Sequence, residues 1–176
     1  IVNEIIRTRE RYPGQRVFIW KSDMARWYRW ILLDPAAVPF FAVQWDNLVY
    51  LDAALSFGNR GSALAAQRIM WAVAWMYRTR IPPHQGTYNR GVSCRCRGHC
   101  DCGENSALVY IDDTLGFSAE KHAKQNFSSF LALADYLGLR LSKKEGHISP
   151  PASVCICLDL EYDTDNNNHG ATLVQT

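Results

Sequence analysis

The pattern of hydrophobic and polar positions predicts strands and helices in a mixed order. Segment 16–20 (RVFIW) is rich in β-branched and aromatic residues and follows a Pro-Gly turn signal, so it predicts a buried strand that ends near Asp23. Apolar residues partly alternate over 44–51 (QWDNLVYL), which indicates a second strand. From residue 62 to about 80 the chain lacks Gly and Pro and is rich in Ala, Met and Trp, which predicts a largely buried helix.

The C-terminal half of the chain predicts a hairpin, a helix and a last strand. Apolar segments at 107–111 and 114–117 would pair across a tight turn formed by the two Asp residues between them. Apolar residues recur at three- and four-residue steps over 119–137, which predicts a helix, and Gly138 is suited to follow its end. Segment 154–160 predicts the last strand. This order predicts an α+β fold, an antiparallel sheet with helices packed on one face.

The composition indicates one folded domain rather than a disordered or membrane-spanning chain. Of its 176 residues, 48% are hydrophobic and 20% are charged, which is enough apolar surface for a core. The longest apolar candidate, 69–77, is bounded by Arg68 and Arg78 and is much shorter than the roughly 20 residues that a spanning helix needs. The N-terminus does not resemble a signal peptide. We therefore expect a soluble intracellular protein, either cytoplasmic or nuclear.

Charge is distributed unevenly along the chain. Residues 1–100 contain 14 Lys and Arg against 6 Asp and Glu, whereas residues 101–176 contain 5 against 11. A basic half joined to an acidic half suits a polyanion that is held beside a carboxylate-rich metal site. Two ordinary solvated faces would explain the same distribution equally well.

Three carboxylates are candidates for such a metal site. Asp23 follows a predicted strand, and Asp112 and Asp113 lie at the predicted hairpin tip. If these strands are neighbours, the three like charges would raise one another's pKa values, so a cation should compensate them. Hard oxygen ligands favour Mg²⁺ or Mn²⁺, and two such ions can activate a 3′-hydroxyl and stabilise a leaving pyrophosphate. Adjacent Asp residues are also common in ordinary turns.

Several segments, in order, resemble the palm motifs of reverse transcriptases. The YIDD segment 110–113 resembles the YxDD signature of that family. The other segments are similar to the first, second and next palm motifs and to the final hydrophobic strand: 21–29 (KSDMARWYR), 55–67 (LSFGNRGSALAAQ), 137–144 (LGLRLSKK) and 154–162. The resemblance covers residues 16–162. The sequence is most similar to the reverse transcriptases of the tyrosine-recombinase (DIRS-type) retrotransposons. It implies a polymerase-type palm and an RNA-directed DNA polymerase, a nucleotidyltransferase that extends a primer.

The resemblance assigns roles to the acidic residues and to two lysines. Asp23, Asp112 and Asp113 would bind two Mg²⁺ or Mn²⁺ ions, with the carbonyl of Met24 as a further ligand. Lys144 would protonate the pyrophosphate, and Lys143 would contact the substrate. Either lysine could equally be a solvated surface residue. The implied partners are an RNA or DNA template-primer and deoxynucleoside triphosphates.

Three further residues would shape the nucleotide pocket. Tyr28 would lie under the incoming sugar and reject a 2′-hydroxyl, although a core Tyr beside two Trp residues is an equal alternative. Gly58 would let the backbone approach the nucleotide. Gln67 would line the template–nucleotide pocket, or would simply cap an apolar helix face.

The resemblance implies a division of the chain into segments, and the sequence departs from the family at several positions. Residues 1–15 would be a remnant that leads into a palm at 16–162, with a Cys-rich insertion at 82–106 and a polar tail at 163–176. The second motif has Ser and Ala at its usual Pro positions, and Asp159 replaces a usual Gly. The fingers and thumb of the family lie outside the match, so other protein parts would supply them.

The insertion contains a second candidate metal site, which the resemblance does not predict. Four thiols and one imidazole lie within nine residues and suit Zn²⁺: Cys94, Cys96, His99, Cys100 and Cys102. Free thiols and disulfides remain alternatives. We expect Trp20, Trp71 and Trp75 in the core, and we interpret His122 and His147 as structural.

Two alternatives to a polymerase follow from these features. A domesticated, non-catalytic palm could serve as a scaffold or as the nucleic-acid-binding part of a larger assembly. In the second, a zinc-binding interaction module centred on residues 94–102 would carry the function.

Overall fold

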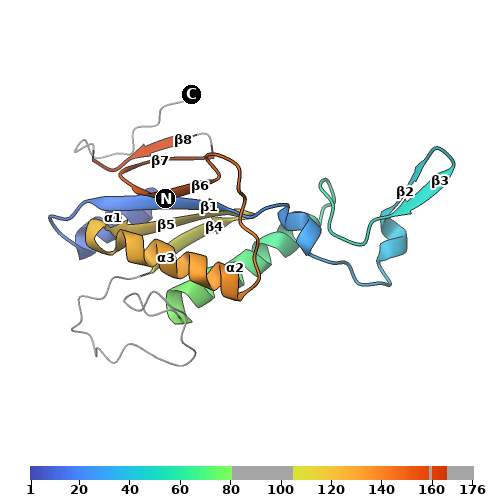
Figure 1. Cartoon of the computed structure of the whole chain (residues 1–176), viewed down its shortest axis with the longest axis horizontal. Helices are drawn as coiled ribbons and strands as arrows, with labels where there is room; N and C mark the ends of the chain where they lie inside the picture. The colour runs from blue at the N-terminus through green and yellow to red at the C-terminus, as the bar shows by residue number, and fades with distance from the viewer. Residues whose placement is uncertain (81–104, 159, 166–176) are drawn as a thin grey trace.

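The computed structural model of the chain describes residues 1–80, 105–158 and 160–165 (Figure 1). The cysteine cluster at 94–102 and most of the predicted insertion lie outside these residues, as does the tail beyond residue 165. No described helix is both long and apolar enough to cross a membrane.

A four-stranded antiparallel sheet forms the centre of the fold (Figure 1). Its strands lie in the order β4 (Ser106–Tyr110), β5 (Asp113–Ala119), β1 (Val17–Asp23) and β6 (Ile148–Ala152). The β4–β5 hairpin and the buried strand β1 agree with the predicted pattern. The edge strand β6 was not predicted, because Pro150 and Pro151 interrupt it; proline is tolerated in edge strands, where no partner needs its missing N–H.

Two helices cover one face of this sheet, as the α+β prediction requires. They are α2 (Ser62–Arg80) and α3 (Glu120–Tyr136), close to the predicted bounds. The buried Trp20 ring lies against them, 4.8 Å from the Phe130 ring centroid and 5.9 Å from that of Tyr77. Gly138 follows α3 with a φ of 69°, the left-handed conformation that suits a residue beyond a helix end.

The outer surface of α2 corrects the expectation that its Trp residues are buried. Trp71 and Trp75 are 56% and 53% exposed, whereas Met70, Val73 and Tyr77 point into the core. One helix can bury only one side, and the apolar composition of α2 hides which side that is.

The opposite face of the sheet is covered by elements that the sequence pattern missed. The N-terminal segment forms helix α1 (Val2–Arg11), and the predicted last strand is a hairpin of β7 (Val154–Cys157) and β8 (Leu160–Asp163). They form a second core together with alternate residues of β1 and β5: Ile5, Val17, Ile19, Leu115, Phe117, Cys155, Cys157 and Tyr162. Burial raises the pKa of each of the two Cys thiols to about 11.

A separate two-stranded hairpin projects from one end of the molecule (Figure 1). It consists of β2 (Ala42–Trp45) and β3 (Leu48–Leu51), where we expected one strand. Asp46 and Asn47 have φ values of 47° and 58°, the pair of left-handed residues that a tight hairpin turn requires. Two short 3-10 helices, η1 (Trp27–Trp30) and η2 (Val38–Phe41), lie between β1 and this hairpin.

Candidate functional site

The backbone brings the three candidate aspartates to one end of the sheet. Asp23 at the end of β1 lies directly opposite Asp113 at the start of β5. The Met24 N–H donates a hydrogen bond to the Asp112 carbonyl at 3.1 Å, which joins the end of β1 to the β4–β5 turn. Residues that are about 90 positions apart in the sequence therefore become neighbours.

The turn itself differs from the expected one. Its two central residues are Ile111 and Asp112, whereas Asp113 already belongs to β5. Ile111 has a φ of 55°, a left-handed conformation that is rare and strained for a β-branched residue. Strain of this kind persists only where surrounding contacts hold the backbone in place.

Gln67 on α2 supplies such contacts. Its Oε1 accepts a hydrogen bond from the Ile111 N–H at 2.7 Å, and its Nε2 donates to the Val109 carbonyl at 3.1 Å. One amide thus satisfies backbone groups on both sides of Tyr110. Sequence reasoning placed Gln67 near the site but did not show this bridge, because the helix and the turn are far apart in the chain.

The electrostatics of the aspartates are uneven. Partial burial raises the pKa of Asp112, and the negative charges of Asp23 and Asp113 raise it further, whereas Lys21 lowers it. Asp113 forms an ion pair with Lys21, whose Nζ lies 3.4 Å from its Oδ1. Asp23 contacts Nδ1 of His147. Two of the three carboxylates are therefore paired within the chain.

The three carboxylates do not all line the same pocket. Asp23 and Asp112 line one pocket of about 630 Å³, whereas Asp113 lines a mainly apolar pocket of about 240 Å³ with Tyr110 and Cys157. The other residues that line the larger pocket are Met24, Ala25, Arg26, Trp27, Phe57, Ser142, Lys143, Lys144 and His147. Within the described part of the chain, no three His, Cys, Asp or Glu side chains are grouped as a metal site.

His147 is the residue that sequence reasoning missed. We interpreted it as structural, but it lies in the larger pocket against Asp23, which is 124 positions away. The backbone N–H of His147 donates to the Lys144 carbonyl at 3.2 Å, and the backbone N–H of Ser142 donates to the Asp23 carbonyl at 2.8 Å. These bonds fix the loop beside the end of β1. No local spacing could have indicated the contact.

The remaining predicted residues lie around this pocket. Tyr28 is buried and its ring lies 4.6 Å from the Phe57 ring; burial raises the pKa of its hydroxyl, and the charge of Asp112 adds to the effect. Gly58 has a φ of 83°, a backbone conformation that favours glycine, and an added Cβ would meet no described protein atom within 4 Å. Lys143 and Lys144 are exposed at the pocket wall.

Comparison with known proteins shows a likeness in fold. No family model matches the chain, and no curated protein matches it. Among solved structures, the foamy viral protease-reverse transcriptase dRH in complex with double-stranded DNA is similar with a TM-score of 0.66 and 10% identity, over 91% of this chain and 23% of that chain. Another foamy viral protease-reverse transcriptase complex with double-stranded DNA gives 0.57 and 14%, over 89% and 26%.

The native Prototype Foamy Virus protease-reverse transcriptase is similar as well, with a TM-score of 0.55 and 14% identity over 92% of this chain and 18% of that chain. The chain thus spans about a quarter or less of these solved structures. The fold resembles a reverse transcriptase domain, with the antiparallel sheet and packed helices of a polymerase palm.

Proposed function

We propose that this chain is a reverse-transcriptase palm that takes part in RNA- or DNA-templated DNA synthesis, the transfer of nucleotides to a primer 3′-hydroxyl. The observation that carries the proposal is the pocket shared by Asp23 and Asp112 at the strand end and hairpin turn of a reverse-transcriptase-like fold. The DP pair at 34–35, after the first motif, and the WDNLVYLD segment at 45–52 favour a retrotransposon origin of the DIRS type.

Asp23 and Asp112, which line one pocket, offer carboxylate oxygens to a divalent ion. Carboxylate oxygens are the ligands that Mg²⁺ and Mn²⁺ prefer, and the raised pKa of Asp112 marks a negative charge that a cation would stabilise. Asp23, Asp112 and Asp113 would hold two such ions, with the Met24 carbonyl as a further ligand. When bound, the ions would supply activation of the 3′-hydroxyl and stabilisation of the leaving pyrophosphate.

The chain's own residues would bind and orient the substrate. Lys143 and Lys144 in the pocket wall would attract the triphosphate, and Lys144 would donate a proton to the pyrophosphate. The Tyr28 ring would exclude a 2′-hydroxyl. Gln67 would act by holding the Ile111 turn, and thereby Asp112, in place. Gly58 would shape the adjoining turn.

The proposed partners are a template-primer duplex and deoxynucleoside triphosphates. Two of the similar foamy viral proteins are bound to double-stranded DNA. Because the chain spans about a quarter or less of them, other protein parts would supply the fingers and thumb that grip the substrates. Such synthesis would take place in the cytoplasm or the nucleus.

A second candidate function is a non-catalytic palm that acts as a scaffold or as a nucleic-acid-binding part of a larger assembly. It is favoured by the contact of Asp23 with His147 and the ion pair of Asp113 with Lys21, since two of the carboxylates already have partners within the chain. A zinc-binding module at residues 94–102 remains a third hypothesis, on residues that the structure does not describe.

Primer extension on an annealed RNA template and DNA primer, with Mg²⁺ or Mn²⁺, tests the proposal. We expect the whole chain to extend the primer and Asp112→Asn to lower the rate roughly a hundredfold or more, since charge stabilisation at the reacting centre is lost. Asp46→Asn, in the exposed hairpin turn, is the matched control and should extend normally. A folded chain that binds the primer–template without extending it would support the scaffold instead.

A further inference from the structure

The outward side of α2 carries a short apolar strip with one positive charge. Leu64 and Trp71 are 51% and 56% exposed, and the exposed Arg68 lies between them in the sequence. Steps of three and four residues place all three on one side of the helix, opposite the buried Met70 and Val73. We call Leu64, Arg68 and Trp71 the α2 strip. At about 1.5 Å per residue it extends roughly 10 Å along the helix.

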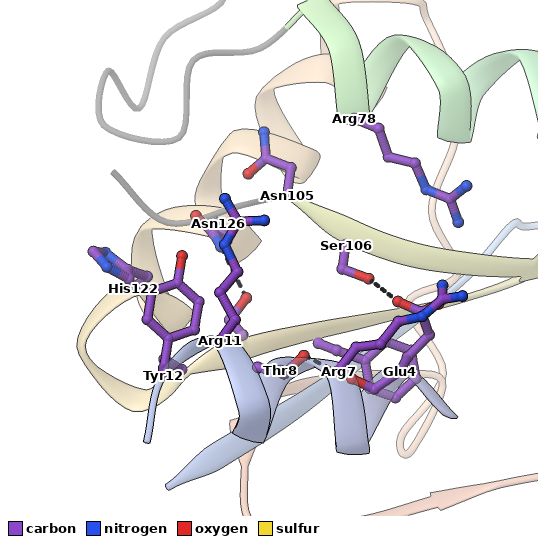
Figure 2. A pocket seen from close by; sticks show the side chains of 13 residues that line it. Glu4, Arg7, Thr8, Arg11, Tyr12, Arg78, Asn105, Ser106, His122 and Asn126 are labelled. Carbon is purple, nitrogen blue, oxygen red and sulfur yellow. Dashed lines mark hydrogen bonds and ion pairs between the residues drawn. The ribbon is translucent and has the colours of Figure 1, made fainter. Parts of the chain in front are cut away.

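The C-terminal end of the same helix belongs to a different surface. Arg78 lines the pocket drawn in Figure 2, where its guanidinium donates a hydrogen bond to the Ala107 carbonyl. Arg68 does not line that pocket, and its side chain forms no hydrogen bond or ion pair with the residues that the structure describes. The charge of Arg68 is therefore available to a partner outside the chain.

The projecting β2–β3 hairpin presents an apolar side of similar size. Cross-strand pairing places four of its side chains together on that side: Val43, Trp45, Leu48 and Tyr50. They are between 52% and 73% exposed. Figure 1 shows the hairpin well away from the middle of α2, so the hairpin and the α2 strip of one chain are not packed against each other.

The hairpin and the α2 strip differ in charge. Asp46 lies at the hairpin turn directly after Trp45, and its carboxylate has no hydrogen bond or ion pair within the described part of the chain. Segment 30–59, which includes the hairpin, contains three Asp and no Glu, Lys or Arg, whereas α2 contains three Arg and no Asp or Glu. Opposite charges favour a contact between the two surfaces, and like charges oppose a contact of either surface with its own copy.

We propose that the β2–β3 hairpin of one chain docks on the α2 strip of a second copy of this chain. In this contact Trp45 and Leu48 cover Trp71, and Asp46 lies beside Arg68. Two different surfaces take part, so the contact is head-to-tail and leaves each pair of chains with one free hairpin and one free strip. Only a few side chains are covered on each surface, so the association is weak and depends on concentration. The proposal does not rest on the polymerase function.

Mixing two complementary variants of the whole chain tests this contact. The hairpin variant combines Trp45→Thr with Leu48→Thr, and the helix variant combines Leu64→Gln with Trp71→Gln, all at exposed positions. In sedimentation velocity over a concentration series, the unchanged chain should form species larger than a dimer, and each variant alone should associate about tenfold more weakly or less. An equal mixture should form a dimer that does not grow, because the intact strip of one variant meets the intact hairpin of the other.

The charges give an independent measurement should the apolar variants fold poorly. Arg68→Glu should weaken association about tenfold, because two carboxylates then meet. Asp46→Asn, which tolerates the left-handed turn, should weaken association in the unchanged chain but strengthen it in the Arg68→Glu chain. Lys124→Glu, at an exposed position on α3, is the matched control and should associate normally, as should Asp112→Asn.

Three results would overturn the proposal. The first is a folded helix variant that associates as strongly as the unchanged chain, since this would indicate a contact between two hairpins. The second is an equal mixture of folded variants that forms no dimer. The third is an unchanged chain that stays monomeric at every concentration, whether or not its α2 strip binds another partner such as single-stranded DNA.

Discussion

At the residue scale, two carboxylates of the candidate site already have side-chain partners within the chain. The His147 ring contacts Asp23, and Lys21 pairs with Asp113, while Asp112 has a raised pKa and carboxylate neighbours. A cation that enters the pocket must therefore compete with His147 for Asp23. The competition follows from one long-range contact, and it can be measured with a metal ion alone.

Replacing His147 with Ala should make Mn²⁺ bind more tightly. The variant removes a hydrogen bond to a charged group, so we expect about a tenfold gain in affinity, which corresponds to roughly 1.4 kcal/mol. Titration calorimetry or the spectroscopic signal of free Mn²⁺ would measure it. His122→Ala, on α3 and outside the pocket that Asp23 and Asp112 line, should leave the affinity unchanged. Weaker Mn²⁺ binding by the His147 variant would show instead that the imidazole is a metal ligand.

At the scale of elements, α2 holds the hairpin turn in a strained shape. Gln67 bonds to backbone groups at both Val109 and Ile111, and Ile111 has a left-handed backbone. The position of Asp112 thus depends on a helix residue that need not touch any substrate. In this structure the Gln67 amide holds the turn through these two hydrogen bonds.

Gln67→Leu should destabilise the protein by about 1–3 kcal/mol, since the Ile111 N–H and the Val109 carbonyl lose their partners. Urea unfolding would measure the loss, and amide hydrogen exchange at Ile111 should become faster. Gln125→Leu on α3 is the control, because the Gln125 side chain forms no hydrogen bond with the residues that the structure describes. An unchanged rate of amide exchange at Ile111 would contradict the idea that Gln67 holds the turn.

The close contact between β5 and β1 leads to a second prediction at the scale of elements. A Cβ at Gly116 would overlap the indole ring of Trp20, which is fully buried. Gly116→Ala should therefore lower the free energy of unfolding by about 1–3 kcal/mol through overpacking. Gly61→Ala is the control, because its Cβ would meet only Asn59 Oδ1 at 3.7 Å. Equal stability of the two variants in thermal unfolding would argue against this packing.

At the scale of the whole molecule, the projecting β2–β3 hairpin is the most exposed apolar element that the structure describes. Its strand residues are all exposed, and Val43, Trp45, Leu48 and Tyr50 share one side by their cross-strand pairing. The chain has no Lys or Arg between Arg29 and Arg60. Exposed apolar strands that carry no lysine or arginine are prone to associate.

Trp45→Thr combined with Leu48→Thr should reduce self-association and the binding of a hydrophobic dye, while Tm stays nearly constant because neither side chain is buried. Analytical ultracentrifugation would measure the association. Ile6→Thr combined with Val154→Thr, at exposed apolar positions on α1 and β7, is the matched control. A large fall in Tm for the hairpin variant would mean that the hairpin packs against the body of the protein.

Local patterns in the sequence predicted the main elements. The strand that ends at Asp23, the helices near 62–80 and 120–136 and the YIDD hairpin all have apolar periodicities or turn residues that act over a few positions. The α+β class followed from their order, and the palm resemblance followed from the motifs. Elements without a clear local pattern were missed: α1, the proline-containing β6 and the two short hairpins in place of single strands.

Tertiary structure alone decided how these elements meet. The contact of His147 with Asp23 and the bridge from Gln67 to the turn join residues that are far apart in the chain. The same is true of which side of α2 is buried, since its apolar residues surround the helix. Backbone conformation depends on near neighbours, so sequence patterns reveal it. Contacts between distant side chains depend on the packing of the whole sheet, and only the folded chain determines them.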